Sequence, residues 1–255
     1  MNEKIDVVIL AKNSEKTLEY CCKAVLTRIP VNNLIIVVGK SVDKTLEVAE
    51  KYAHLVIEEE TNTIGSARDL GLKHVETKFY ASIDSDVIIS PEWYNWCIKT
   101  ICENPSVGAC EGYVKPFGHH YYDFQYSLKD KGYCSLGNTL LRTKLIKEVG
   151  MPHEPYEEDM YLRERIERRN YNWAVNFDVV STHLVNDVDI FRHYIYFGKH
   201  EKCSLVTLLK TLVLSFRDFI NSKNAGINLR IYLLLLKMSR FYGLISGKRI
   251  QTFSD

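Results

Sequence analysis

The sequence predicts an α/β protein in which a mostly parallel sheet is flanked by helices. From Ile5 to Ile83, short apolar segments alternate with segments whose apolar residues follow helical spacing. This alternation is typical of βαβ units, in which successive strands lie parallel. With 255 residues and 46% apolar content, the chain is long enough to form one large domain, or one domain with an appendage, around a sizeable core.

The first half of the chain is predicted to contain four strands separated by three helices. The strands are expected at 5–11, 34–38, 54–58 and 79–83, and the helices at 14–28, 43–52 and 64–75. Ser14 and Asp43 belong to the residue types that cap helix amino termini. Pro91 suits the first turn of a further helix that carries Trp93 and Trp96. These residues support the helix boundaries and carry no functional information.

The second half of the chain is less regular. Segments 107–115 and 133–142 contain apolar strand-like residues and enclose a turn-rich stretch with aromatic residues at 119–122. Further elements are expected in this order: a helix at 144–149, a charged helix from the acidic group at 157–159 to about residue 169, and a strand at 173–180. Aromatic residues on a long loop beside a sheet often contact a ligand.

Cysteine usage and charge exclude several classes of protein. The seven cysteines are odd in number and include no C-x-x-C pair, which favours buried thiols in a reduced, cytosolic protein without a zinc site. The chain opens into a strand-like segment too short to span a bilayer, so no signal peptide is expected. Residues 199–250 carry ten Lys and Arg against two acidic residues, whereas the remainder is net acidic. Basic character is confined to the tail, which argues against a nucleic-acid-binding protein.

Two carboxylates, Asp84 and Asp86, directly follow the fourth predicted strand. In an open parallel sheet, ligands collect at the carboxyl ends of the strands, where Asn13 and Asp43 are also expected. Carboxylate oxygens favour Mg²⁺ or Mn²⁺ over zinc, and such a cation can neutralise a diphosphate leaving group. Alternatively, the two aspartates cap the turn before Pro91 and stay solvated. For this motif alone, the two interpretations are about equally supported.

Six segments occur in the order and spacing of family 2 glycosyltransferases. The first four have the sequences VVILAKN from Val7, SVDKT from Ser41, GSARDLG from Gly65 and DSD from Asp84. In the second half, GNTLLR from Gly137 resembles the acceptor-side strand of the family, and EDMYLRER from Glu158 resembles its E-D-x-D-L-x-x-R helix. From residue 5 to about residue 183, the chain therefore resembles an inverting transferase of the GT-A fold.

The resemblance implies a role for each group of motif residues. The nucleotide-sugar donor would be bound by Lys12, Asn13, Asp43, Gly65, Arg68, Asp84 and Ser85. A Mn²⁺ or Mg²⁺ ion would be held by Asp84, Asp86 and His183, and Asp159 would be the general base. An inverting transfer needs one such carboxylate, which takes the proton of the acceptor hydroxyl as that hydroxyl attacks the anomeric carbon. As a single histidine, His183 is about equally well explained by a structural role.

Two further acidic residues, Glu157 and Glu158, directly precede Asp159. Repulsion between like charges would raise the pKa of Asp159, which suits a general base. Alternatively, the three acids simply begin a helix, where they are favoured by its dipole. Without the upstream motifs, this second interpretation would prevail.

The sequence departs from the family pattern at three places, and each departure affects a role that the resemblance would otherwise assign. Members commonly carry acidic residues after the second strand, where this chain has Val38-Gly39-Lys40, so recognition of the nucleotide base stays unassigned. Asp69 replaces the usual Asn, and we expect a local structural role with Arg68 as its partner, or a donor contact. The processive signature Q-x-x-R-W is absent, which favours transfer of a single sugar.

Residues 199–255 are predicted to form a basic helical extension of a catalytic domain that spans residues 1–198. Apolar residues at helical spacing among Lys and Arg predict two amphipathic helices within 204–250. Such helices bind anionic headgroups as a peripheral contact on the inner face of the membrane, or else they pack on the core or on a second subunit. The two interpretations are equally supported. Charges interrupt the apolar segments, so no transmembrane span is expected.

The leading hypothesis is a metal-dependent, inverting glycosyltransferase that moves one sugar from a UDP- or GDP-sugar to a hydroxyl of a glycan or lipid-linked acceptor. A nucleotidyltransferase is the runner-up enzyme, but its Gly-rich phosphate loop after the first strand is missing. The alternative without catalysis is a degenerate sugar-nucleotide-binding or membrane-scaffold protein, suggested by Val38-Gly39-Lys40 and the basic tail. The sequence does not identify the sugar, the acceptor or the oligomeric state.

Overall fold

The computed structural model describes residues 3–60, 63–116, 134–153 and 158–184, and a few helical residues between 195 and 242. The aromatic stretch at 119–122, Glu157 and nearly all of the tail lie outside these described residues. The chain divides into two compact units, residues 1–117 with 125–184 and residues 118–124 with 185–255. All the motif residues singled out from the sequence belong to the first unit.

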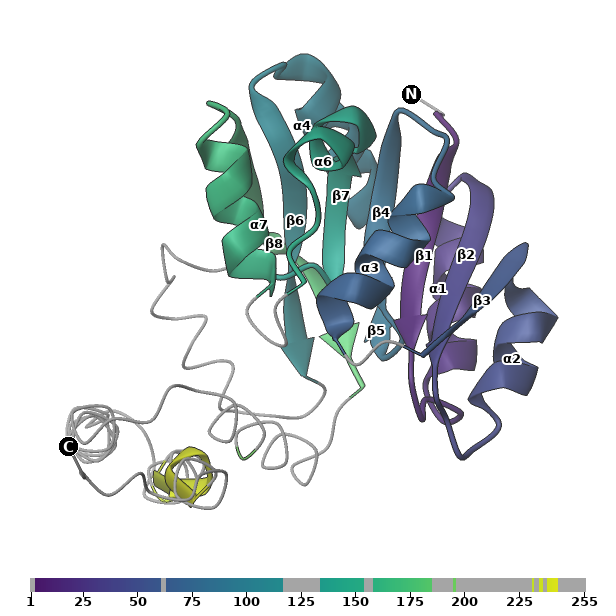
Figure 1. The fold of residues 1–255 in the computed structure, drawn as a ribbon. Helices are drawn as coiled ribbons and strands as arrows, with labels where there is room; N and C mark the ends of the chain where they lie inside the picture. The colour runs from purple at the N-terminus through teal and green to yellow at the C-terminus, as the bar shows by residue number, and fades with distance from the viewer. Residues whose placement is uncertain are drawn as a thin grey trace, which may run out of the picture. The chain divides into compact units, whose positions relative to one another are not determined.

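The described strands form one eight-stranded sheet in the order β3-β2-β1-β4-β7-β6-β8-β5 (Figure 1). Their bounds are β1 Ile5–Ala11, β2 Val31–Gly39, β3 Leu55–Glu59, β4 Phe79–Asp84, β5 Val87–Ile88, β6 Val107–Pro116, β7 Asn138–Arg142 and β8 Asn172–His183. β1 pairs in parallel with β2 and β4, β2 with β3, and β6 with β8. β7 runs antiparallel to β4 and β6, and β5 runs antiparallel to β8. The predicted mostly parallel sheet is confirmed, with one antiparallel strand inserted near its centre.

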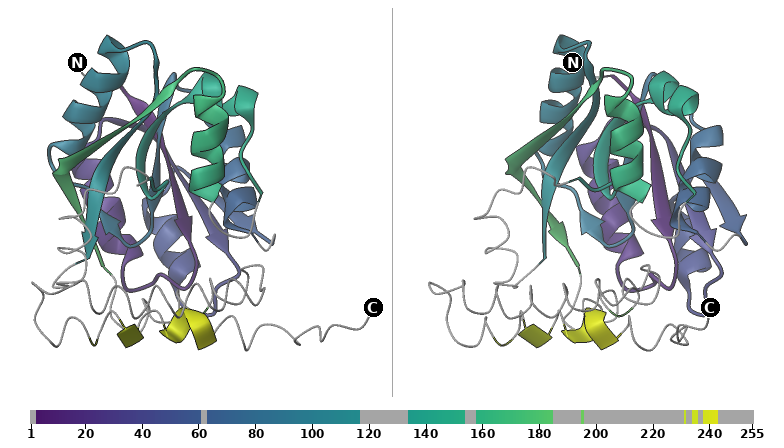
Figure 2. Two further views of the ribbon diagram at one scale, coloured as in Figure 1. Left: turned by 90° about the vertical axis from the view of Figure 1, so that its left-hand side faces the viewer. Right: turned by 60° about the vertical axis from the view of Figure 1, so that its left-hand side comes forward.

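Helices cover both faces of the sheet (Figure 2). The first core cluster lies between the sheet and α1 Leu18–Arg28, α2 Thr45–Tyr52 and α4 Trp93–Glu103. The second lies between the opposite face and α3 Ile64–Lys73, α6 Thr143–Val149 and α7 Glu158–Glu167. The three-layer arrangement follows from the apolar stripe of each helix, which must be buried against the sheet.

The central strands are apolar on both faces because helices cover both. In β1, Val7 and Ile9 belong to the first core cluster and Val8 to the second, and all three are at most 1% exposed. Side chains alternate across a strand, so a strand buried on both faces becomes a continuous apolar segment. All six described cysteines are free thiols, and four of them are buried.

Two helices begin later than the sequence predicted. α1 begins at Leu18 rather than at Ser14, whose carbonyl instead closes a turn by accepting the N–H groups of Thr17 and Leu18. α2 begins at Thr45 rather than at Asp43, whose carboxylate accepts the Thr45 N–H at 3.1 Å. The residues before each helix therefore form loops at the carboxyl ends of β1 and β2. Among the residues that the structure describes, every helix is too short or too polar to cross a bilayer.

Gly71 allows α3 to pack closely on the sheet, which makes it sensitive to substitution. A methyl group added there would lie 2.5 Å from Cγ1 of Val8 and 3.2 Å from Cγ2 of Val37. We predict that Gly71→Val lowers the free energy of unfolding by about 1–3 kcal/mol, because the added atoms force β1 and α3 apart. The exposed Lys73→Ala on the same helix should stay within about 0.5 kcal/mol of the parent protein. Urea unfolding measures both, and equal stability of the two variants would contradict the close packing.

Candidate active site

Asn13 joins the loops that follow β1 and β2. Its backbone is in the left-handed region, with φ of 51°, which asparagine adopts more readily than most residues. Its N–H donates to Ser41 Oγ at 3.0 Å, and its Oδ1 accepts the Val42 N–H at 3.0 Å. The predicted donor-binding asparagine therefore holds together two loops at the carboxyl edge of the sheet.

Asp43 has a structural role in the same pair of loops. In addition to the Thr45 N–H, its carboxylate accepts the Glu15 N–H at 3.2 Å. Partial burial alone would raise the pKa of Asp43, but the hydrogen bonds from Thr45 and Glu15 outweigh burial and lower it. The carboxylate is therefore ionised and fixed at the edge of the sheet.

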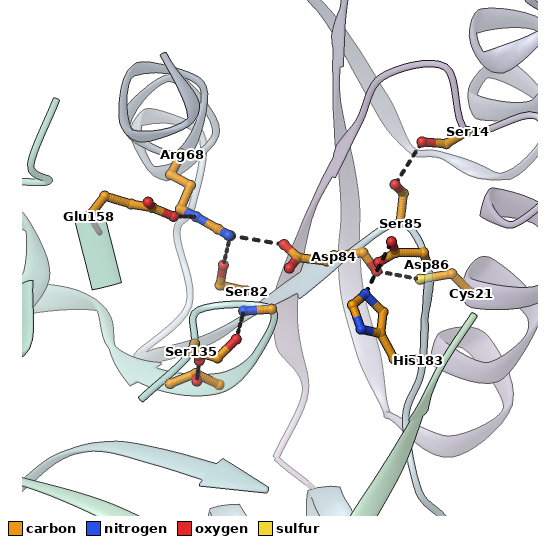
Figure 3. A network of polar contacts seen from close by, with 12 residues as sticks. Ser14, Cys21, Arg68, Ser82, Asp84, Ser85, Asp86, Ser135, Glu158 and His183 are labelled. Carbon is orange, nitrogen blue, oxygen red and sulfur yellow. Dashed lines mark hydrogen bonds and ion pairs between the residues drawn. The ribbon is translucent and has the colours of Figure 1, made fainter. Parts of the chain in front are cut away.

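Asp84 is the last residue of β4, and it is held through both its carboxylate and its backbone (Figure 3). Arg68 Nη2 donates to its Oδ1 at 2.9 Å, and its backbone N–H donates to the carbonyl of Gly137 at 3.1 Å. A methyl group added at Gly137 would lie 2.2 Å from Asp84 Oδ2, so the glycine leaves the space that this oxygen occupies. With 35% of its side chain exposed, Asp84 still has an open side.

Arg68 projects from α3 and joins β4 to α7. Besides its bond to Asp84, the guanidinium donates from Nη1 to Ser82 Oγ at 2.7 Å and from Nε to Glu158 Oε1 at 3.2 Å. The Arg68 side chain is 4% exposed, and that of Glu158 is 8% exposed. Burial alone would lower the pKa of Arg68, but the two carboxylates raise it, so the guanidinium remains charged.

Asp69 does not pair with Arg68, so that part of the sequence expectation is wrong. Its carboxylate forms ion pairs with Lys73 Nζ at 3.1 Å and with His153 Nε2 at 3.6 Å. Consecutive helix residues project about 100° apart. Arg68 therefore points toward the sheet while Asp69 lies along the side of α3, next to the residue one turn later.

Asp86 and His183 meet where β5 pairs with the end of β8. Val87 lies opposite His183 in this pairing, which brings His183 Nε2 to 3.2 Å from Asp86 Oδ2. Burial alone would lower the pKa of His183, but the carboxylate of Asp86 raises it above its ordinary value. The sequence had placed these two residues together as cation ligands, and the structure brings them into contact.

The third predicted cation ligand, Asp84, faces Arg68 rather than the Asp86–His183 pair (Figure 3). Across the described part of the chain, no group of three or more His, Cys, Asp or Glu side chains is close enough to hold a metal ion. The chemistry of two carboxylates and an imidazole nevertheless fits Mn²⁺ or Mg²⁺. Asp84 and Asp86 are each about one-third exposed, which leaves carboxylate oxygens open to a cation. The assignment of the three ligands stays a prediction.

Asp159 lies in the first turn of α7 and is half-buried. Burial and, secondly, the charge of Glu158 raise its pKa to about 6, against the opposing effect of the Met160 N–H, which donates to Oδ1 at 2.8 Å. The sequence expectation that acidic neighbours raise the pKa is confirmed for Glu158. The larger contribution, burial, could not be seen from the sequence.

Glu111 is a buried acid that sequence reasoning missed. It lies in β6 with no exposed surface, and its Oε2 accepts from Trp173 Nε1 at 2.8 Å. Burial raises the pKa of Glu111 well above its usual range, so the carboxyl is neutral. Asp159 is among the charges that act on it. The one available signal was a single acid within an otherwise apolar strand.

The other predicted donor-binding residues are Lys12, Gly65 and Ser85. The Lys12 stem lies against Gly39, where an added methyl group would be 3.3 Å from Lys12 Cδ. Gly65 packs so tightly that an added methyl group would lie 1.9 Å from the carbonyl oxygen of Pro152. Ser85 Oγ lies 2.8 Å from that of Ser14. All three therefore line or support the same edge of the sheet, and their contacts with a donor stay predictions.

This sheet topology is that of the GT-A class. A mannosyltransferase from Pyrobaculum calidifontis, solved in complex with GDP-Man and Mn²⁺, matches 98% of this chain and 77% of its own with a TM-score of 0.64 at 14% identity. Glucosyl-3-phosphoglycerate synthase from Mycobacterium tuberculosis, solved with Mn²⁺, UDP and phosphoglyceric acid, matches 73% of this chain and 72% of its own, with a TM-score of 0.57 at 20% identity. At these identities, the likeness shows the fold alone.

Residues 6–175 match the family described as glycosyl transferase family 2, and the chain belongs to this family. It is 24% identical over 196 residues to glycosyltransferase GlyA of Streptococcus pneumoniae, which covers 65% of this chain. It is 26% identical over 112 residues to EpsH of Bacillus subtilis, which covers 42% of this chain. The chain spans 28% of the length of GlyA and 33% of that of EpsH in these matches.

The space left by Gly137 provides a test of how Asp84 is held. We predict that Gly137→Ala displaces the Asp84 carboxylate from Arg68, and lowers the free energy of unfolding by about 1–3 kcal/mol, because the methyl group overlaps Oδ2. Gly39→Ala is the matched control, since its methyl group meets the flexible Lys12 side chain at 3.3 Å. Urea unfolding of both variants checks the prediction, which fails if Gly137→Ala is as stable as Gly39→Ala.

Proposed function

We propose that this chain is an inverting glycosyltransferase that moves a single sugar from a nucleotide-sugar donor to an acceptor hydroxyl. The observation that carries the proposal is Asp159, a half-buried carboxylate with its pKa raised to about 6, on which the charges of Arg68 and Asp84 also act. A base whose pKa lies near the working pH combines a large ionised fraction with useful proton affinity. Membership of the family supports the transferase activity.

The donor is proposed to lie at the carboxyl edge of the sheet. The residues assigned to it are Lys12, Asn13, Asp43, Gly65, Arg68, Asp84 and Ser85. Five of these, Asn13, Asp43, Arg68, Asp84 and Ser85, are already joined to neighbouring loops or elements by hydrogen bonds, so the edge is organised before a ligand arrives. GDP-Man and UDP are the nucleotides in the two solved relatives, which makes UDP- and GDP-sugars the first donors to test.

Asp84, Asp86 and His183 are proposed to hold Mn²⁺ or Mg²⁺. When bound, the cation would supply positive charge against the diphosphate that leaves the sugar. Within this set the protein provides an imidazole already positioned by Asp86, and a carboxylate of Asp84 that Arg68 keeps in one orientation. Mn²⁺ or Mg²⁺ also accompanies the nucleotide in the solved relatives.

Asp159 is proposed to accept the proton of the acceptor hydroxyl. As the hydroxyl oxygen bonds to the anomeric carbon, the bond from that carbon to the diphosphate oxygen breaks on the opposite face. A single displacement inverts the configuration of this carbon, and Asp159 ends the step protonated. This mechanism needs one general base, which Asp159 would supply, and it needs no second carboxylate as a nucleophile.

The acceptor is proposed to be a glycan or a lipid-linked intermediate at the cytoplasmic face of a membrane. Its support comes from the basic segment 204–250, whose charge and apolar spacing suit anionic headgroups. Nearly all of this segment lies outside the described residues, so the proposal depends on the sequence pattern.

The proposed activity is tested by donor turnover with a panel of UDP- and GDP-sugars, with and without Mn²⁺. We predict that Asp159→Asn lowers the rate by about 10²–10⁴-fold, because the amide cannot take the acceptor proton, while donor-dependent thermal stabilisation persists. Asp178→Asn, an exposed aspartate in β8, is the control and should retain the parental rate. Parental turnover by Asp159→Asn would refute its role. Donor binding by the parent protein without any turnover would instead favour the degenerate binding protein.

The pKa of Asp159 also predicts the acid side of the pH dependence. Since the base must be ionised, kcat/KM should rise with pH through about 6 and level off above it. An ordinary exposed aspartate would give that rise near pH 4. The initial rate at subsaturating donor, measured from pH 4.5 to 8 with a check that the fold persists, distinguishes the two. A flat profile down to pH 5 would contradict the raised pKa.

A further inference from the structure

Three segments that are distant in the sequence meet on one buried side chain. All three nitrogens of the Arg68 guanidinium have protein partners, namely Ser82 and Asp84 on β4 and Glu158 at the start of α7. Asp84 belongs to the proposed donor and cation side of the site, whereas Glu158 directly precedes the proposed base. The guanidinium therefore spans the two halves of the site (Figure 3).

We propose that Arg68 is a positioning residue, which holds the donor-side carboxylate and the helix that bears the base in fixed register, rather than a donor contact. The inference rests on the proposed function and changes the role that the family resemblance implied for this residue. Burial supports it, because a side chain 4% exposed between two carboxylates has little surface left for a ligand. A planar guanidinium with N–H groups on three nitrogens can also hold several hydrogen-bond partners in a fixed geometry, which a lysine ammonium cannot.

The helix that carries Arg68, α3, is closely packed at both of its ends. Near its start, Gly65 packs against the carbonyl of Pro152, in the segment that leads towards α7. Near its end, Gly71 packs against Val8 and Val37 of the sheet. Since α3 is packed against Pro152 at one end and against β1 and β2 at the other, the helix has little freedom to shift, and the Arg68 backbone cannot follow a movement of either carboxylate partner.

The same bridge balances charge around the base. The charge of Glu158 favours the protonated form of Asp159, and Arg68 opposes it. Asp84 in β4 also favours the protonated form. Glu111 in β6 and Cys134 before β7 are neutral groups, and the charge of Asp159 raises their own pKa values further. Loss of the Glu158 charge would therefore change both the position of the base and its proton affinity.

Glu158→Gln removes one end of the bridge while preserving side-chain size. We expect kcat to fall at least about tenfold with the donor KM within about twofold of the parent, since the alignment of Asp84 with the base is lost while the donor contacts proposed for Asn13, Asp43 and Ser85, which lie outside the bridge, are kept. The acid limb of the pH profile should move to lower pH, because a negative charge beside Asp159 is removed. Glu164→Gln on the same helix is the matched control. The Glu164 carboxylate pairs with Arg168 at 2.6 Å on the exposed side of α7, so neither kcat nor the acid limb of the pH profile should change in this variant.

Arg68→Lys separates the positioning role from a donor contact. A lysine keeps the positive charge but lacks the three hydrogen-bonding nitrogens of the guanidinium, so we expect kcat to fall while the KM for the nucleotide-sugar donor is unchanged. A donor contact predicts the opposite, a raised KM, and that result would overturn the inference. If Arg68→Lys does not fold, Glu158→Gln still tests the positioning role. A Glu158→Gln protein with the same kcat and the same acid limb of the pH profile as Glu164→Gln would overturn the inference.

A readout without turnover keeps this inference distinct from the proposed function. Absence of turnover by the parent protein with every donor counts against the function alone. Amide hydrogen exchange then tests the bridge, because loosening its α7 end should also free β4. We expect faster exchange at the Asp84 amide, which donates to Gly137, in Glu158→Gln and not in Glu164→Gln. Equal protection of the Asp84 amide in the two variants would refute the bridge.

Discussion

The structure of the site depends on one buried ion-pair network, in which Arg68 joins Asp84 and Glu158. Burying charges is costly unless each is paired, and breaking a buried pair by removing one partner costs about 3–5 kcal/mol. Glu158 and Arg68 are both nearly inaccessible to water, so this constraint applies to them in full. Asp84 is one-third exposed, so water also solvates its charge. The network is fixed at its α7 end and open to a ligand at its β4 end.

A row of polar side chains across the sheet marks where the hydrophobic core ends. The register of β4, β7 and β6 places Ser82 opposite Thr139, and Thr139 opposite Glu111, and all three are buried. One row earlier on the same face, the corresponding residues are apolar and belong to the second core cluster: Tyr80, Leu141 and Ala109. Arg68 satisfies Ser82, and Trp173 satisfies one oxygen of Glu111. The Thr139 hydroxyl donates to the Ser135 carbonyl. Buried polar groups are tolerated here because each has a hydrogen-bond partner outside the row.

Much of the fold could be predicted from local pattern, since alternating apolar and amphipathic segments determine βαβ units. The strand ends that carry Asn13, Asp43 and Asp84 were found in the same way. The partners of Arg68 could not be found, because they lie 14, 16 and 90 residues away and the side chain's direction depends on helix rotation. Helix starts were misplaced for a related reason. Ser14 and Asp43 have capping chemistry, but they use it in loops that hold neighbouring strands together.

The antiparallel direction of β7 explains how two remote motifs meet. A parallel strand beside β4 would bring its own carboxyl end to Asp84, and its preceding turn would lie at the opposite edge of the sheet. Because β7 is antiparallel, its first residues lie beside the last residues of β4, with Asn138 opposite Ile83. Gly137, one residue earlier, is thereby brought against the Asp84 carboxylate. The segment that begins at Gly137 and the one that begins at Asp84 are distant in the sequence, and the antiparallel direction of a single strand makes them neighbours.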